Sequence, residues 1–305
     1  MVASCFNFSF ISLYGHYLRR QFIAAGLSQQ RANIDDETTI HFWGPKPGIN
    51  LPPKPSLVLL HGFGPIALWQ WRQQVCFLSP HFNIYVPNLL FFGGSTTKSS
   101  ERTEVFQAVS VGKLMEILGV ERFSVMGTSY GGFVAYHMAA MWPERVDKVV
   151  IASSAVNMVR RDNKELMERA KVERIEDLML PTTAGQLRTL LVLAAFKTPK
   201  VMPDFLLNDF LDKLYFENRE EKIELLKGLT IGRDDTPNIS PLQQEVLLVW
   251  GDHDNIFPLK KATELKELLG EKARLEVMKN TSHVPQIEQP EQFNEIVKDF
   301  LCASS

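Results

Sequence analysis

The stretch FSVMGTSYGGFVAYHMAAM, residues 123–141, decides how this chain folds. Its first four residues form a short apolar run, as in a buried strand, and apolar residues after Gly131 recur at the steps of three and four that a helix favours. Between the two runs stands Gly127-Thr-Ser129-Tyr-Gly131, a Gly-x-Ser-x-Gly sequence. A serine in a sharp turn needs small neighbours, which the two glycines supply. The pattern predicts that Ser129 is a nucleophile presented at the head of a helix.

Two later segments carry the partners that a serine nucleophile needs. An apolar run at Glu245–Trp250 predicts a strand that leads to Asp252 and Asp254, and a second at Arg274–Met278 leads to His283. A serine hydroxyl is a weak nucleophile, so an imidazole must take its proton and a carboxylate must orient that imidazole. The chain order of serine, acid and histidine predicts that His283 is the general base. Both carboxylates lie on one loop, and either could orient it.

Backbone amides could complete this site by binding the negative charge that develops on a carbonyl oxygen. One donor is expected next to the nucleophile, at the amide of Tyr130. The other is expected in the loop His61-Gly-Phe-Gly-Pro65, which follows a strand predicted at Leu57–Leu60. Glycines let the backbone of such a loop approach a ligand closely. The sequence therefore predicts the amide of Phe63 as the second donor and a structural role for the His61 ring.

Together these segments resemble the α/β-hydrolase superfamily, and the resemblance covers nearly the whole chain. It rests on the His-Gly-Phe-Gly loop, the Gly-x-Ser-x-Gly turn, Gly251-x-x-Asp254, and His283 followed by Glu288-x-Pro290. In related sequences the acid is the Asp of Gly-x-x-Asp. The resemblance thus implies a catalytic triad of Ser129, Asp254 and His283, with no metal and no organic cofactor.

The resemblance also implies the fold, an α/β-hydrolase fold with a mostly parallel eight-stranded sheet flanked by helices. Residues 35–153 and 241–305 would form the core, and residues 154–240 a helical lid inserted between strands 6 and 7. Apolar residues at helical spacing predict three helices in the insertion, at Leu187–Phe196, Phe205–Phe216 and Glu220–Leu229. Their apolar character predicts a hydrophobic substrate. The candidate substrate-binding residues are Gly62, Trp69, Leu191 and Phe196.

Details of the motifs rank the reactions. The resemblance is strongest to the lidded branch that holds meta-cleavage-product C–C hydrolases, epoxide hydrolases and many plant hydrolases. Epoxide hydrolases use an aspartate where this chain has Ser129, and the C–C hydrolases usually carry a Trp after the catalytic His, where this chain has Val284. A serine hydrolase of carboxylic esters therefore ranks first and C–C bond hydrolysis of diketones second. A ligand-binding receptor on the hydrolase scaffold is the third reading, since such receptors can keep the triad.

The composition fits one compact enzyme. The chain has 305 residues, 45% of them hydrophobic, so it can bury a large core. A net charge of −2 argues against a nucleic-acid partner. Three scattered cysteines give neither a disulfide framework nor zinc spacing, which favours a reducing compartment such as the cytoplasm. We expect a monomer or a weak dimer that binds a hydrophobic small molecule.

The N-terminal segment, residues 1–34, differs from the rest. It has three arginines and no acidic residue, and apolar residues recur in it at helical steps. No run reaches the 18 apolar residues that a membrane span needs. Three readings follow: a helix packed on the core, a helix at a membrane surface that makes peripheral contact through residues 1–25, or an organelle transit peptide.

Overall fold

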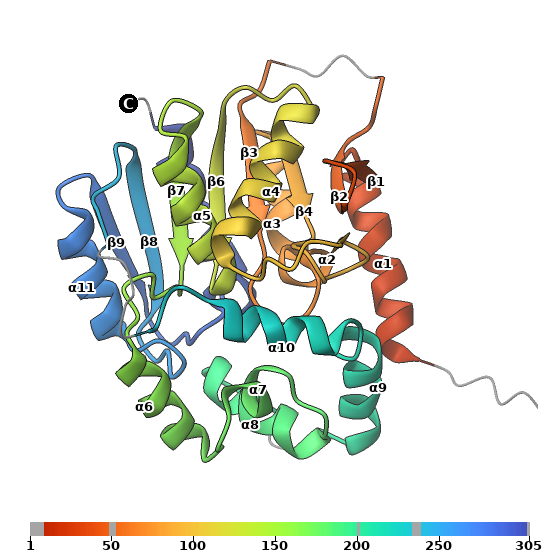
Figure 1. Ribbon diagram of the computed structural model, residues 1–305, viewed down its shortest axis with the longest axis vertical. Helices are drawn as coiled ribbons and strands as arrows, with labels where there is room; N and C mark the ends of the chain where they lie inside the picture. Colours follow the sequence, from red (N-terminus) through yellow and green to blue (C-terminus); the bar gives the residue numbers. More distant parts are fainter. Residues whose placement is uncertain (1–8, 49–52, 200–201, 234–238, 304–305) are drawn as a thin grey trace, which may run out of the picture.

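The computed structural model describes residues 9–48, 53–199, 202–233 and 239–303. One sheet runs through the centre of the protein, with helices on both faces and a group of helices across one end (Figure 1). The strands follow the order β1-β2-β4-β3-β6-β7-β8-β9, and β5 pairs with β2 outside this path. Their bounds are β1 Leu27–Asn33, β2 Thr38–Pro45, β3 Ser56–Leu60, β4 Asn83–Pro87, β5 Thr96–Thr97, β6 Phe123–Thr128, β7 Val146–Ala152, β8 Glu245–Gly251 and β9 Ala273–Met278.

The sheet is mostly parallel, as predicted. The pairs from β4 through β3, β6, β7 and β8 to β9 are parallel, and within the described ranges only the pairs that involve β2 are antiparallel. Parallel strands need helical crossovers that cover both faces, so most residues of the central strands β3, SLVLL, and β8, EVLLVWG, are apolar and buried. The main path has the predicted eight strands, and the two-residue β5 makes a ninth.

Two apolar cores lie on the two faces of the sheet. Neighbouring residues of β3 show the division, since Val58 and Leu60 belong to one core and Leu57 and Leu59 to the other. The first core is covered by α4 Glu104–Ile117, α5 Tyr130–Met141 and α11 Leu259–Leu269. The second is covered by α1 Phe10–Ala24, α2 Ala67–Gln70, α3 Arg72–Leu78 and α13 Pro290–Cys302. The short helix α12, Pro285–Glu288, precedes α13.

The insertion between β7 and β8 is helical, and its helices lie together across one end of the sheet (Figure 1). Its elements are α6 Arg160–Ala170, α7 Ile175–Met179, α8 Ala184–Ala194, α9 Asp204–Leu214 and α10 Arg219–Gly228. The three predicted helices correspond to α8, α9 and α10, whereas α6 and α7 were not predicted. A small core of its own joins α8 and α9 through Leu187, Leu207 and Leu211.

The N-terminal segment divides into two elements, which corrects its treatment as one unit. Residues 27–33 form β1, the edge strand of the sheet, so the core begins before residue 35. Helix α1 packs on the core through Leu18 and Phe22. Its other side exposes large apolar residues, namely Phe10, Leu13, Tyr14, Tyr17 and Ile23. Among the described residues, no helix is long and apolar enough to cross a membrane.

Candidate active site

The turn between β6 and α5 holds Ser129 in a strained conformation. Its backbone has φ 51° and ψ −122°, a left-handed combination that costs a non-glycine residue about 1–3 kcal/mol. Both motif glycines are required by close approach. A Cβ on Gly127 would overlap the carbonyl of Gly131, and one on Gly131 would overlap the carbonyl of Leu60. The two glycines therefore permit the tight turn that places Ser129 between the carboxyl end of β6 and the start of α5.

The structure brings the three predicted triad residues together. Nε2 of His283 lies 3.0 Å from Oγ of Ser129, and Nδ1 of His283 lies 3.0 Å from Oδ2 of Asp254. All three residues are buried. When Nδ1–H donates to the carboxylate, Nε2 is left as an acceptor for the serine hydroxyl. This arrangement can withdraw a proton from Ser129 and stabilise the imidazolium that results.

The carboxylate that meets the histidine is Asp254 and not Asp252. Oδ1 of Asp254 also accepts the amides of Ile256 and Phe257, each at 2.9 Å, which fixes the carboxylate in place. Asp252 instead pairs with His253 at 2.6 Å and with Lys279 at 3.8 Å. Burial alone would raise the pKa of Asp252. The hydrogen bond from His253 and the charge of that ring outweigh burial, so the pKa of Asp252 is lowered overall. Among the described residues, the Asp252 carboxylate thus forms no hydrogen bond or ion pair with Ser129, His283 or Asp254.

The two predicted donor amides lie beside the nucleophile. Within the described ranges, neither the amide of Phe63 nor that of Tyr130 donates to another residue. The neighbouring backbone comes very near Ser129, because a Cβ on Gly62 would stand 3.0 Å from that of the serine. Free backbone donors at a buried serine suit a developing oxyanion.

Two side chains hold the loop that carries Phe63. Oε1 of Gln70 accepts the amide of Gly62 at 2.8 Å, and Nε2 of Gln70 donates to the carbonyls of Gly62 and Pro65 at 2.9 and 2.5 Å. The His61 ring donates from Nδ1 to Gly62 and accepts the Leu89 amide at Nε2. Burial lowers the pKa of His61 to about 4, so the ring is neutral and structural, in agreement with the prediction. Sequence reasoning had missed Gln70.

A cavity of about 500 Å³ opens at Ser129. Most of its lining is apolar and comes from elements far apart in the sequence: Tyr14 of α1, Trp69 of α2, Leu190 and Leu191 of α8, Phe210 of α9 and Ile287 of α12. Tyr14 and Phe210 both pack their rings against Trp69, at 5.2 and 5.9 Å between centroids. The cavity can therefore receive a largely apolar ligand next to the nucleophile.

Three of the four predicted substrate-binding residues line this cavity, namely Gly62, Trp69 and Leu191. The fourth, Phe196, does not. It lies beyond the end of α8, and its ring packs on His253 with 4.5 Å between centroids. The cavity also contains residues that the sequence did not single out, above all Tyr14 and Arg72. Nothing in the sequence marks them as cavity residues, because their position at the site depends on how α1 and α3 pack.

The loop that carries His283 is bound to the end of α8. The His283 amide donates to the carbonyl of Ala194, and Oγ of Ser282 donates to the carbonyl of Leu193, both at 3.1 Å. The Glu288 carboxylate spans the same junction, since it accepts the amides of Phe196 and Ser282, each at 2.6 Å. The insertion therefore supports the histidine directly.

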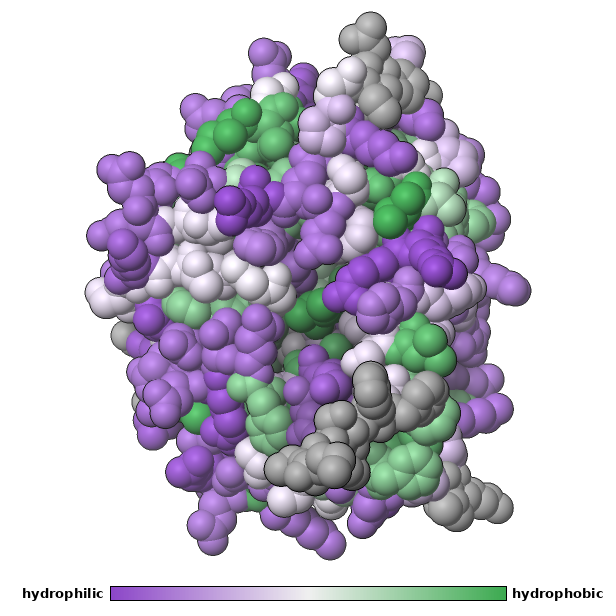
Figure 2. Space-filling model, turned by 90° about the vertical axis from the view of Figure 1, so that its right-hand side faces the viewer, coloured by the Kyte–Doolittle hydropathy of each residue, from purple (hydrophilic) through white to green (hydrophobic). Residues whose placement is uncertain are grey.

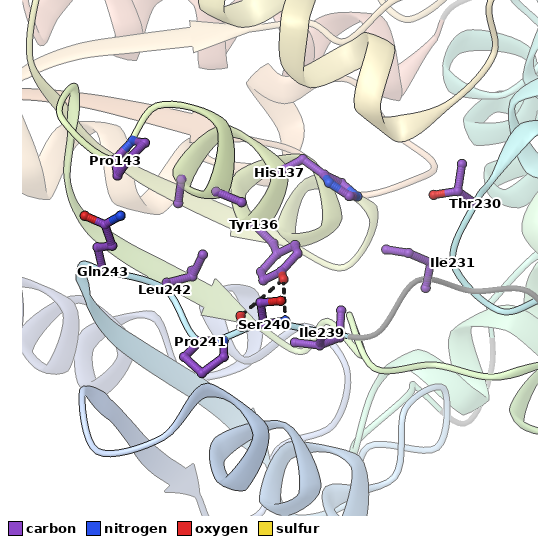
Figure 3. A pocket seen from close by; sticks show the side chains of 12 residues that line it. Tyr136, His137, Pro143, Thr230, Ile231, Ile239, Ser240, Pro241, Leu242 and Gln243 are labelled. Atoms are coloured by element: carbon purple, nitrogen blue, oxygen red, sulfur yellow. Dashed lines mark hydrogen bonds between the residues drawn. The ribbon is translucent and has the colours of Figure 1, made fainter.

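A second hollow, of about 390 Å³, lies behind α5 (Figure 3). Tyr136 points into it, and its hydroxyl exchanges hydrogen bonds with the backbone of Ser240. Pro241, Leu242 and Ile231 line it as well. None of its lining residues belongs to the triad or to the donor loop, so this hollow is separate from the site at Ser129.

The sequence of motifs, the sheet order and the triad geometry agree with one family. The profile of the alpha/beta hydrolase fold family matches residues 55–290. The chain belongs to this family. The match includes all three triad residues and the whole helical insertion.

Known α/β hydrolases resemble the chain over most of its length. Monoacylglycerol lipase ABHD6 of Mus musculus is 25% identical, over 96% of this chain and 87% of the relative. Pimeloyl-[acyl-carrier protein] methyl ester esterase of Vibrio campbellii is 26% identical, over 81% and 95%. Among solved structures, a bacterial membrane phospholipase A superposes with a TM-score of 0.79 at 23% identity, covering 95% of this chain and 91% of the other. The 2-hydroxy-6-oxo-6-phenylhexa-2,4-dienoate hydrolase of Rhodococcus sp. strain RHA1 gives 0.73 at 22%, covering 91% and 99%. The structural likenesses show the shared fold.

Proposed function

We propose that this protein is a serine hydrolase that cleaves a carboxylic ester of a hydrophobic small molecule. The observation that carries the proposal is the geometry of Ser129, His283 and Asp254 at the floor of an apolar cavity. The names of the curated relatives, a monoacylglycerol lipase and a methyl ester esterase, describe ester hydrolases and support the same reaction.

The first half of the reaction forms an acyl-enzyme. Oγ of Ser129 attacks the ester carbon while Nε2 of His283 takes the serine proton, and Asp254 stabilises the imidazolium. The carbonyl oxygen becomes an oxyanion, and the amides of Phe63 and Tyr130 donate to it. The oxyanion then collapses, the bond to the alcohol oxygen breaks, and His283 returns its proton to that oxygen.

The second half releases the acid by the same groups. A water molecule takes the place of the alcohol, His283 accepts one of its protons, and the water oxygen attacks the acyl carbon. The second tetrahedral oxyanion collapses, and the proton on His283 returns to Oγ of Ser129. Each cycle consumes one water and needs no metal or organic cofactor.

The helical insertion, residues 154–240, acts in this proposal as a lid. Leu190, Leu191 and Phe210, which come from α8 and α9, line the cavity at Ser129 and support this role. Burying one more methylene contributes about 0.8 kcal/mol, so kcat/KM should rise up to about fourfold per CH₂ until the cavity is full.

The exposed side of α1 supports a peripheral contact with a membrane surface. Leu13 and Tyr17 are 59% and 53% exposed, and Phe205 of α9, whose ring lies 6.4 Å from that of Phe10, is 61% exposed. The space-filling view toward α1 has apolar patches among polar side chains (Figure 2). Exposed Arg19 and Arg20 would attract anionic lipid. Sedimentation with phosphatidylserine vesicles should fall for Leu13→Glu and stay unchanged for Leu268→Glu, an exposed leucine on α11; equal binding of both would contradict this contact.

A covalent probe tests the proposed nucleophile. A fluorophosphonate should label the wild type and not Ser129→Ala, whereas Ser99→Ala, on a distant loop, should label fully. Equal labelling of Ser129→Ala would falsify the assignment. A panel of p-nitrophenyl esters and a ring-cleavage diketone then decides the reaction. Fast diketone cleavage with negligible ester turnover would move the protein to C–C hydrolysis, and tight binding without turnover to a receptor.

A further inference from the structure

The cavity at Ser129 contains an arginine that pairs with no acidic side chain among the described residues. Arg72 is the first residue of α3 and lines the cavity, largely buried beside Tyr14 and Trp69. Its Nη1 donates to the carbonyl of Trp69 at 2.5 Å. In the part of the chain that the structure describes, no carboxylate lies within 4.0 Å of its guanidinium. Burial lowers the pKa of Arg72, but an arginine still keeps its proton at neutral pH.

Two acids in or next to the cavity lining accept backbone amides instead. Glu288 lines the same cavity, yet both of its oxygens accept backbone amides. Asp209 on α9 accepts the amide of Ile11 at the start of α1. A second cation, Lys197, is exposed and lines the cavity as well. The lining therefore presents more positive than negative charge to a ligand, in a setting where an unpaired charge is unfavourable.

We propose that Arg72 binds a carboxylate or phosphate group that the ester substrate carries away from its reacting carbon. This inference rests on the proposed ester hydrolysis and names the class of substrate, an amphiphile with an apolar chain and an anionic oxygen group. One guanidinium N–H is used by the carbonyl of Trp69 and another by the hydroxyl of Tyr14, and the donors that remain suit a planar, two-point contact with such a group. Lys197 adds positive potential where the cavity meets solvent.

The enzyme should prefer an ester with an anionic chain end to a neutral ester of the same length, because a neutral chain offers Arg72 no hydrogen-bond acceptor. A neutral chain that fills the cavity covers Arg72 and leaves without a partner the donors that Trp69 and Tyr14 do not use, whereas an anionic chain end replaces the lost water. Charge-assisted hydrogen bonds at a part-buried site correspond to about a tenfold to hundredfold preference. Because the contact is remote from the ester carbon and present before and after attack, it should appear mainly in KM.

Matched esters measure this preference. Mono-p-nitrophenyl suberate and p-nitrophenyl octanoate share an eight-carbon acyl chain and differ in the terminal carboxylate. The kcat/KM ratio of the first to the second should be at least tenfold in wild type and fall to about one in Arg72→Gln. Arg161→Gln, an exposed arginine on α6, is the control and should keep the wild-type ratio. An ester of 8-phosphonooxyoctanoic acid distinguishes phosphate from carboxylate as the preferred group.

A wild-type ratio near one for both anionic esters overturns the proposal, even if Arg72→Gln fails to fold. A preference that survives in folded Arg72→Gln overturns it as well. Binding of monomethyl suberate to Ser129→Ala by calorimetry gives a readout that needs no turnover, and it should weaken at least tenfold when Arg72→Gln is added. If Ser129 is neither labelled nor active on any ester, the proposed function fails, and this binding result alone decides the anion site.

Discussion

Replacing Asp254 by asparagine should nearly abolish turnover without unfolding the protein. Two backbone amides, from Ile256 and Phe257, donate to Oδ1 of Asp254, and His283 contacts Oδ2. An asparagine keeps only one acceptor oxygen. Because two amide donors face the Oδ1 position, the asparagine oxygen must occupy it, and the NH₂ group must face His283.

The histidine then has to reverse its protonation. Nδ1 of His283 must accept from the asparagine, so the ring proton moves to Nε2, the atom 3.0 Å from Oγ of Ser129. In this tautomer the ring donates to the serine and cannot take its proton. We expect kcat to fall about 10⁴-fold, as the same exchange does in the serine-protease triad, which corresponds to about 5 kcal/mol in the barrier.

The assay compares kcat for p-nitrophenyl butyrate and the thermal midpoint of each variant. Asp254→Asn should melt within a few degrees of wild type, because both amide contacts persist. Asp252→Asn is the matched control and should keep kcat within threefold, since Asp252 pairs with His253 and Lys279. The reasoning is refuted if kcat of folded Asp254→Asn falls less than tenfold. It is refuted as well if kcat falls further in Asp252→Asn than in Asp254→Asn.

Three further predictions test other parts of the structure. Gln70→Ala should lower kcat about tenfold to hundredfold with little change in KM, because the loop that carries the Phe63 amide loses its support. A rise in KM with an unchanged kcat would contradict this. Lys222 of α10 is buried with its Nζ 4.7 Å from the centre of the Phe92 ring, and burial lowers its pKa to about 8, so the charged form destabilises the folded state below that pH. Lys222→Met should raise the free energy of unfolding in urea by about 1–3 kcal/mol at pH 7, and the gain should shrink as pH rises from about 8 toward 10.5; a gain independent of pH would rule out this cause. For p-nitrophenyl esters from acetate to decanoate, kcat/KM should reach an optimum in chain length that a folded variant with a linker in place of residues 154–240 loses, and a flat profile in wild type would remove the apolar-pocket proposal.

The sequence was most informative where local chemistry leaves few alternatives. Strand, glycine turn and helix around Ser129 form a continuous segment, and the same holds for the loops of Asp254 and His283. The edge strand Leu27–Asn33 could not be predicted in this way, because only its first residue is buried and its strand conformation comes from pairing with β2. The cavity residue Tyr14 was missed for a similar reason, since only the packing of α1 brings it to the site. Phe196 was assigned to the cavity from its apolar character, but the chain turns at the end of α8 and carries its ring toward His253.

The hydrogen bonds between the end of α8 and the His283 loop restrict how the insertion can move. If α8 shifted away from the sheet, the carbonyls of Leu193 and Ala194 would leave Ser282 and His283, and the His283 ring would lose its position beside Ser129. A motion that keeps the enzyme competent must therefore pivot about this end. The far end of the insertion meets α1, where the Ile11 amide donates to Asp209 at 3.0 Å. We expect the N-terminal helix, which belongs to neither the parallel strands nor the insertion, to control entry of the substrate.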